Sequence, residues 1–227
     1  SHSTQIVLRQ CSRCLFMNQG RLVMDGSAKL VTDVYQKFLY SNSNQREVIL
    51  QHLADPVRSQ PDTVEQWLQD PDARLHSGPA STATTMSDQE IAEGPSSAEV
   101  AYGNGTAEIY NASLTDLAGR EVRVLSAGER YRWQFAVRFF EPAYNLNFGM
   151  LIRTIDGMIV SGINTEQLGQ RLREVSPDQT AQIAFEFTAN FGTGTYYFEC
   201  GVVGETDTQV AEGGFLHRRV DVIGARV

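Results

Sequence analysis

The chain contains 227 residues, of which 41% are hydrophobic and 20% are charged, and this composition is typical of a folded globular protein. Its 19 Lys and Arg residues against 27 Asp and Glu residues give a formal net charge of −8, which argues against a broad nucleic-acid-binding surface. No run of about 18 apolar residues is present, so we expect no membrane-spanning helix.

The first 40 residues predict a helix, a hairpin and a second helix. Residues 5–10 have a helical pattern, and the apolar runs 15–17 and 21–24 flank Asn18-Gln19-Gly20, which is typical of a tight turn. Ser27 is the expected N-cap of the second helix. The apolar residues of that helix recur at helical spacing and predict one buried face: Leu30, Val31, Val34, Tyr35, Phe38 and Leu39.

The three cysteines, Cys11, Cys14 and Cys200, are an odd number without a disulfide framework, which favours a reducing compartment. Cys11 and Cys14 have CxxC spacing. However, no second pair of Cys or His residues follows at zinc-finger distance. We therefore expect these cysteines to pack as ordinary side chains and expect no metal site.

Several short motifs stand together at the start of the chain: Ser1-His2-Ser3, Leu8, Cys11, Arg13 and the run 15–26. Together they resemble the last part of an ABC-transporter ATPase domain. In that family a histidine after the final core strand contacts the γ-phosphate of the nucleotide, and the resemblance implies that His2 is the matching residue. The alternative is that His2 is a remnant of a purification tag.

This chain is nevertheless not expected to be a working ATPase. It has no G-x-x-x-x-G-K-[ST] loop to hold phosphates and no apolar strand ending in Asp-Glu to hold magnesium. ATP and magnesium would therefore belong to the full-length parent protein, and we expect no cofactor in this chain. Without a phosphate loop, His2 would be inactive here.

The middle of the chain carries weaker signals. Residues 48–53 predict a helical turn or two, and Thr63–Leu68 predicts a short helix in which Trp67 packs as a core residue. Residues 76–105 are rich in Ser, Thr, Gly and Pro, as in a linker. We therefore expect three parts: an ATPase remnant at 1–40, a helical and flexible linker at 41–104, and a β-rich domain at 105–227.

The β-rich part predicts an antiparallel sandwich. In the stretch 129–140 the apolar side chains alternate with polar ones, as in a half-buried strand, and Asp156-Gly157 is the strongest hairpin signal. Residues 164–179 are expected to form a long polar loop. Because no helix separates the strands, an immunoglobulin-like or jelly-roll fold is favoured. The other expected strands are 106–116, 121–125, 147–154, 158–163, 180–188, 195–203 and 216–223.

A candidate binding face follows if the strands that contain Asn147, Thr195 and Leu216 share one sheet. An aromatic ring beside carboxylates and guanidinium groups suits a sugar, because C–H faces pack on rings and hydroxyls need donors and acceptors. The alternative is a solvated face with cross-strand ion pairs. The candidate carbohydrate-binding residues are Arg153, Tyr197, Glu199, His217, Arg219 and Asp221.

A hydrolase is not expected. Glu186 and Glu199 are the carboxylates that would be paired in a glycosidase, but we expect them on different sheets. The chain has no G-x-S-x-G motif and no metal-ligand spacing. We therefore predict no catalytic residues.

Further motifs follow one another in order: residues 105–109, 124–129, 148–153 followed by Asp156-Gly157, and 194–198. With the ATPase-like start, they resemble the Wzt-type ATP-binding subunit of ABC exporters for O-antigen polysaccharide of lipopolysaccharide. The resemblance implies a β-sandwich that recognises the polysaccharide, in some members through its modified non-reducing end. The alternative is a dimerisation or docking module for the ATPase or membrane subunit, without glycan binding.

The same resemblance implies the partners and the location of the chain. The membrane channel is a separate subunit in that family, so we expect a cytoplasmic protein held at the bacterial inner membrane through the transporter. ABC ATPases act in pairs, so a homodimer is expected, and exchange of the strand 216–223 is one way to form it. No nucleic-acid partner is expected.

Overall fold

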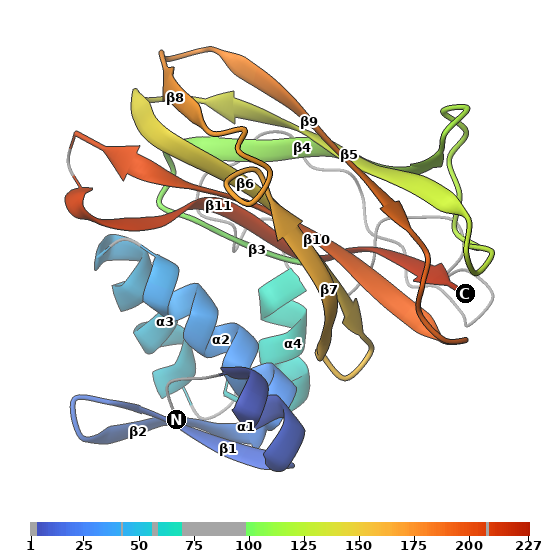
Figure 1. Ribbon diagram of the computed structural model, residues 1–227. Coiled ribbons are helices and arrows are strands. Elements are labelled where there is room, and N and C mark those ends of the chain that lie inside the picture. Colours follow the sequence, from blue (N-terminus) through green and yellow to red (C-terminus); the bar gives the residue numbers. More distant parts are fainter. Residues whose placement is uncertain (1–3, 42, 56–58, 70–98, 208) are drawn as a thin grey trace.

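The computed structural model describes residues 4–41, 43–55, 59–69, 99–207 and 209–227. A layer of N-terminal helices and a hairpin lies against one face of a two-sheet β-sandwich (Figure 1). The mainly antiparallel β-architecture confirms the predicted fold class. The predictions for His2 and for residues 76–98 fall outside the described residues.

The N-terminal segment folds as expected from its sequence. Ser27 caps α2, because its Oγ accepts a hydrogen bond from the backbone N of Leu30 at 3.3 Å. Leu30, Val31 and Val34 are buried on the predicted apolar face, but Tyr35 and Leu39 of the same predicted face are 39% and 41% exposed. The elements are α1 (Thr4–Gln10), β1 (Arg13–Asn18), β2 (Arg21–Ser27) and α2 (Ala28–Tyr40).

Two further helices extend this layer: α3 (Ser43–Ala54) and α4 (Pro61–Gln69). They share one hydrophobic cluster with α2 and with the nearest strands of the sandwich. Because this cluster includes Val100, Tyr102 and Val220 of the sandwich, the helices and the large sheet are packed directly on each other. The helical members of the cluster are Leu30, Val31, Val34, Ile49, Leu53, Val64 and Leu68.

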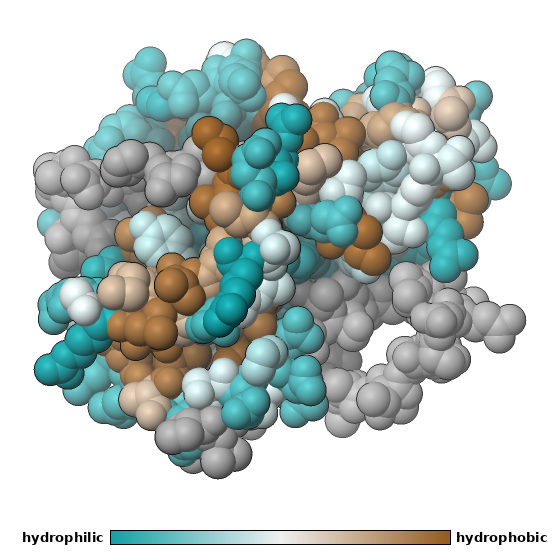
Figure 2. Space-filling view, turned by 90° about the horizontal axis from the view of Figure 1, so that it is seen from below, coloured by the Kyte–Doolittle hydropathy of each residue, from teal (hydrophilic) through white to brown (hydrophobic). Residues whose placement is uncertain are grey.

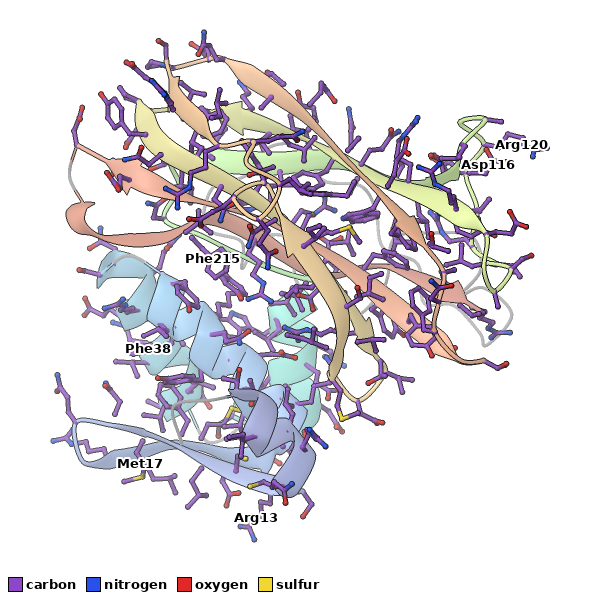
Figure 3. All side chains as sticks on the ribbon, viewed as in Figure 1. Arg13, Met17, Phe38, Asp116, Arg120 and Phe215 are labelled. Carbon is purple, nitrogen blue, oxygen red and sulfur yellow. The ribbon has the colours of Figure 1, made fainter. Side chains whose placement is uncertain are left out.

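The opposite surface of the N-terminal segment is apolar and open to solvent. Leu15, Met17 and Leu22 of the β1–β2 hairpin are 58%, 54% and 57% exposed. Met17 lies at the end of the molecule far from the sandwich (Figure 3), and hydrophobic side chains gather on that end when it is viewed directly (Figure 2). These side chains are absent from the core because the hairpin buries only its other face, through Phe16 and Met24.

The sandwich contains a large and a small sheet. The large sheet has the order β3-β11-β10-β6-β7, with β8 also paired to β6, and the small sheet has the order β4-β5-β9. The strands are β3 (Val100–Tyr102), β4 (Ala107–Asp116), β5 (Arg130–Phe139), β6 (Ala143–Thr154), β7 (Ile159–Asn164), β8 (Leu172–Val175), β9 (Thr180–Thr188), β10 (Thr195–Thr206) and β11 (Gln209–Arg226).

The structure differs from the predicted strands in three places. The expected strand 121–125 makes only isolated bridges, Thr115 with Glu121 and Val124 with Arg226, so it forms no continuous ladder. β8 lies within the expected polar loop 164–179. The sequence did not predict this strand, because three of its four residues are exposed and no alternation of apolar residues marks it. β3 precedes the expected boundary at residue 105 and pairs with β11.

The core lies between the two sheets, and the alternation in β5 is confirmed. Trp133 and Phe139 are 0% exposed and Phe135 is 1% exposed. Trp133 Nε1 also donates a hydrogen bond to the carbonyl oxygen of Glu199 in the opposite sheet, at 3.1 Å. This bond ties the small sheet to β10, and Cys200, the next residue of β10, is buried in the same core.

Gly103 provides a test of how closely β3 approaches β11. A Cβ atom at Gly103 would lie 2.8 Å from His217 Cα and would also collide with Leu216 O. We expect Gly103→Ala to lower the free energy of unfolding by about 1–3 kcal/mol, because the backbones must move apart. Denaturant unfolding measures this change. The matched control is Gly192→Ala, which adds a methyl group in open space; an equal loss in both variants would contradict the close approach.

Candidate functional site

The sequence places three of the six predicted sugar-binding residues correctly on one outward face of the large sheet. Tyr197 of β10 pairs with Arg153 of β6, and Glu199 follows two residues later on the same face. The expectation that this part of the face is exposed is wrong. Arg153 is 2% exposed and Glu199 is 1% exposed, and the helical layer lies on this side of the large sheet (Figure 1).

Irregular pairing of β11 separates the other three predicted residues. The register of β10 and β11 shifts three times, including between Phe198 and Cys200 and between Val202 and Val203. His217 therefore stands opposite the core residue Val202, and its Nδ1 accepts a hydrogen bond from the backbone N of Ile109 at 3.0 Å. A regular alternation cannot predict these positions, because each bulge changes the face of the side chains that follow.

Arg219 and Asp221 likewise take structural partners. The Arg219 guanidinium donates to both carboxylate oxygens of Glu99, at 2.7 and 2.9 Å. Asp221 has a φ of 55° and is 2% exposed, and its Oδ2 lies 3.0 Å from Lys29 Nζ of α2. The six predicted residues therefore do not form one open surface.

Beneath the helices, buried charges form two linked groups. Glu199 lies between two guanidinium groups, 2.6 Å from Arg153 Nε and 2.8 Å from Arg218 Nη2. Lys29 Nζ lies 3.0 Å from both Asp33 Oδ2 and Asp221 Oδ2. The three positive and three negative charges balance, as expected where five of the six side chains are at most 9% exposed and only Lys29, at 34%, reaches solvent.

Burial and charge act in opposite directions on these carboxyl groups. Burial raises the pKa of Glu199, and the positive charges of Arg218 and Arg153 oppose that increase. Burial also raises the pKa of Asp33, against the effect of Lys29. Both carboxylates therefore depend on their cationic partners to remain ionised.

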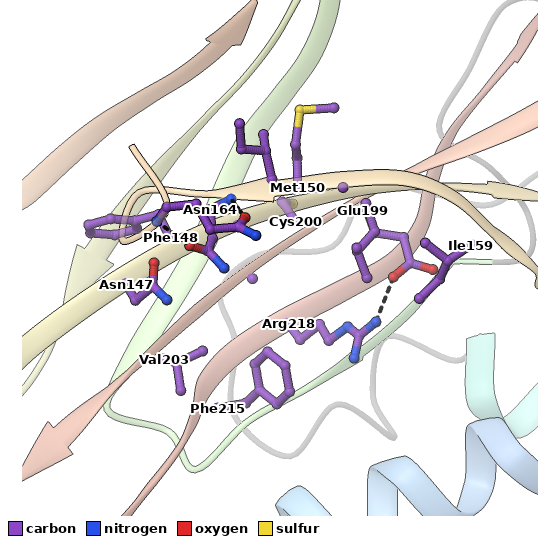
Figure 4. Close-up of a pocket in the computed structure, with 16 residues that line it drawn as sticks. Asn147, Phe148, Met150, Ile159, Asn164, Glu199, Cys200, Val203, Phe215 and Arg218 are labelled. Carbon is purple, nitrogen blue, oxygen red and sulfur yellow. Dashed lines mark hydrogen bonds and ion pairs between the residues drawn. The ribbon is translucent and has the colours of Figure 1, made fainter. Parts of the chain in front are cut away.

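The same sheet face is open farther along β6 and β10, where it forms a groove of about 370 Å³ (Figure 4). Its floor is main chain, because Gly149 and Gly201 stand directly opposite each other. Asn164 of β7 pairs with Gly149 on one side, and Arg218 of β11 pairs with Gly201 on the other. One row across four strands therefore has a polar side chain at each end and no side chain in the middle.

The rows of paired side chains on either side of the glycine row form the walls of the groove. On one side, Asn147 pairs with Val203, which pairs with Phe215. On the other side, Leu151 pairs with Glu199, which carries the buried ion pair to Arg218. The groove therefore has an aromatic ring and aliphatic side chains in its walls, with charges at one end and amides at the other.

The amide end is held in place by local hydrogen bonds. Gln167 N donates to Asn164 Oδ1 at 2.9 Å, and Asn164 N donates to Gln167 Oε1 at 3.1 Å. Asn147 Oδ1 accepts from the backbone N of Glu166 at 3.0 Å. Within the part of the chain that the structure describes, the side-chain nitrogens of Asn164 and Gln167 make no hydrogen bond, so they can donate to a ligand.

Sequence reasoning missed this groove, although a signal was present. Glycine is unfavourable inside a strand and often marks a close approach of a ligand or another backbone. Gly149 and Gly201 both interrupt predicted strands. Arg218 was missed because the bulges of β11 place it, rather than Arg219, on the outward face.

Comparison with known protein families identifies the sandwich. The family model described as the Wzt C-terminal domain matches residues 98–227. This chain belongs to the Wzt C-terminal domain family. The match covers every strand of the sandwich, including β3. It confirms the resemblance seen in the sequence.

One solved structure agrees with this assignment at the level of the fold. A crystal structure of the C-terminal domain of Wzt has 21% sequence identity and a TM-score of 0.54, and the match covers 61% of this chain and 83% of that chain. The putative ApaA protein from Bordetella pertussis gives 9% identity and a TM-score of 0.32 over 51% of this chain and 93% of its own. No curated protein matches the sequence.

Membership of the Wzt family places this chain in O-antigen export, in a carbohydrate-binding or docking role associated with an ABC transporter. In the described parts of the chain, no helix is long and apolar enough to cross a membrane. Among the same residues, no group of three or more His, Cys, Asp or Glu side chains is placed to hold a metal ion. Family membership is consistent with a non-catalytic domain.

Proposed function

We propose that the groove binds O-antigen polysaccharide and that the chain thereby selects this polymer for export. The observation that carries the proposal is the glycine floor between an aromatic wall and an amide end, in a sandwich of the Wzt family. The Phe215 ring offers a surface for the C–H face of a sugar, and the amides of Asn164 and Gln167 offer donors to hydroxyl oxygens.

The size of the groove favours a short segment of the polymer. Its volume of about 370 Å³ is near the lower end of the range of ligand pockets, which is about 300–1,000 Å³. We therefore propose that it takes the end of the chain, including a modified non-reducing end, rather than a long internal stretch. The module acts by binding without chemistry, on the cytoplasmic side, and presents the glycan to the membrane subunit.

Gly149→Val tests the groove without removing any contact. A Cβ atom at Gly149 would lie at an ordinary 3.6 Å from Asn164 Cβ, and valine suits a strand, so we expect the variant to fold. The side chain would occupy the floor, and we expect affinity for the O-polysaccharide to fall more than about tenfold, which corresponds to 1.4 kcal/mol. Calorimetric titration with the O-polysaccharide of the source strain, and with an unrelated polysaccharide, measures this change.

The matched control is Ala184→Val, which enlarges an exposed side chain on the outer face of β9 in the other sheet. It should leave the affinity unchanged. Saturable binding that survives Gly149→Val in a folded protein would move the site away from the groove. If the wild-type chain binds no polysaccharide, the carbohydrate-binding proposal fails and the docking role becomes the leading one.

A specific observation supports a docking role for the N-terminal segment. The exposed side chains of Leu15, Met17 and Leu22 form an apolar surface on the hairpin, on the side away from the groove. This surface suits attachment to another protein, such as the rest of the ATPase. We also propose that two copies act together, as ABC ATPases do, and the molecular mass of the chain in solution tests that pairing.

A further inference from the structure

We infer that helix α2 positions the groove through Lys29, so that docking of the N-terminal helices and binding of the ligand strengthen each other. This inference rests on the proposed function, because it assigns a means of regulation to the same groove. The docking of the N-terminal segment, which resembles the end of an ATPase domain, would then depend on whether the groove holds its ligand. Three contacts together connect the groove with the N-terminal helices, and two of them include Lys29.

The first contact lies within the sheet, where Glu199 lines the groove and also joins the buried charges. Glu199 is 1% exposed and engages Arg153 at 2.6 Å and Arg218 at 2.8 Å. Arg218 in turn ends the glycine row and packs 5.1 Å from the centroid of the Phe215 ring in the groove wall. Glu199 and Arg218 are paired in the groove (Figure 4), so a shift of Glu199 would also move Arg218 and change its packing on the Phe215 ring.

The second contact is the bridge that Lys29 makes from α2 to the sheet. Lys29 Nζ lies 3.0 Å from Asp33 of its own helix and 3.0 Å from Asp221 of β11. Both carboxylate side chains are almost fully buried, at 7% and 3% exposure. Arg153, the partner of Glu199, also acts on Asp33 electrostatically. The two groups of ion pairs, one at the groove and one at the helix, therefore interact through the charges of Arg153 and Asp33.

The third contact is the turn of the β6–β7 hairpin. β7 forms one edge of the groove through Ile159 and Asn164. At its turn, a Cβ atom on Gly157 would lie 3.6 Å from Leu8 Cδ1 and 3.9 Å from Lys29 Cγ. The turn of this hairpin therefore lies next to Leu8 of α1 and Lys29 of α2.

Loss of Lys29 leaves two buried carboxylates without their shared cation, which favours separation of α2 from the sheet. In the separated state, Arg153 and the hairpin lose their support and the groove loses its shape. Coupling is reciprocal, so a ligand that needs the shaped groove must also hold α2 more tightly. Lys29 is thus a positioning residue, since it lines no part of the groove itself.

Lys29→Met in the full chain tests this inference. We expect the affinity for the O-polysaccharide of the source strain to fall at least about fivefold, the lower end of typical coupling between sites. Lys29→Arg keeps the cation and should restore the affinity to within about twofold. The control is Arg120→Met, which breaks an exposed ion pair with Asp116 at the far tip of the sandwich (Figure 3) and should have no effect.

The reciprocal effect is measured by hydrogen exchange. Polysaccharide should slow amide exchange in α2 of the wild-type chain, and Lys29→Met should speed exchange in the groove residues 147–151 without any ligand. Should Lys29→Met fail to fold, Asp221→Asn is the second variant, because it keeps the pair between Lys29 and Asp33.

The outcomes separate the two proposals. If wild type and Lys29→Met bind the polysaccharide equally, the coupling is overturned and the proposed function stands. If the wild-type chain binds no polysaccharide, the proposed function fails, and the exchange experiment without ligand decides the coupling alone. Unchanged exchange at residues 147–151 in Lys29→Met would then overturn it.

Discussion

Replacement of Glu199 by glutamine is expected to lower the free energy of unfolding by about 3–5 kcal/mol. The carboxylate lies between Arg153 and Arg218, and the side chains of both arginines are at most 9% exposed. A neutral amide leaves two buried guanidinium groups without a counter-charge, and these groups cannot recover their hydration while the helices stay docked. Equilibrium unfolding in denaturant, followed by circular dichroism, gives the change.

The chain contains a closely matched control in Glu186. Its carboxylate also lies between two arginines, 2.6 Å from Arg130 and 2.8 Å from Arg132, but its side chain is 39% exposed. Water solvates these groups when the charge is removed, so Glu186→Gln should change stability very little. A large loss in Glu186→Gln, or none in Glu199→Gln, would show that burial is not what makes the first pair important.

The second large effect is expected at Trp133. Its indole is 0% exposed, and Trp133→Ala removes that volume from the centre of the sandwich, which costs about 3–5 kcal/mol of unfolding free energy. Trp133→Phe keeps an aromatic ring beside Phe198, whose centroid is 5.5 Å away, but loses the hydrogen bond to Glu199 O. We expect this variant to lose about 1–3 kcal/mol.

Circular dichroism is the suitable probe for this series, because tryptophan fluorescence changes with the substitution itself. Phe140→Ala is the control, since Phe140 directly follows β5 and is 43% exposed. Its loss should be far smaller than that of Trp133→Ala. If Trp133→Phe proved as destabilising as Trp133→Ala, the hydrogen bond between the sheets would outweigh the packing of the ring.

Most of the sandwich was predictable because buried and exposed side chains alternate along its strands. In β5 buried residues recur at every second position from Tyr131 to Phe139, with Ala136 also buried between them. The turn at Asp156-Gly157 sets the β6–β7 hairpin, with Gly157 at a φ of 80°. β8 was not predictable, since three of its four residues are exposed and only Val175 is buried in the core. Short strands of this kind leave no pattern of side chains.

The site was harder to predict than the fold for two physical reasons. The first is that the sequence does not show whether an outward sheet face is covered, so Arg153 and Glu199 were expected in solvent although both are almost fully buried. The second is that bulges in β11 exchange the faces of neighbouring residues, which brings Arg218 to the groove and sends His217 to the core side. The glycines at 149 and 201 were the available signal.

The glycine pair also determines how such a groove can change its ligand. Because its depth comes from backbone atoms that already belong to the β-ladder, the floor sets a hollow of fixed shape with little chemical preference. Preference resides in side chains at the margin, such as Asn164, Gln167 and Phe215. Exchange of these few residues would adapt the same scaffold to a different polymer, while its strand pairing and its buried charges stay as they are.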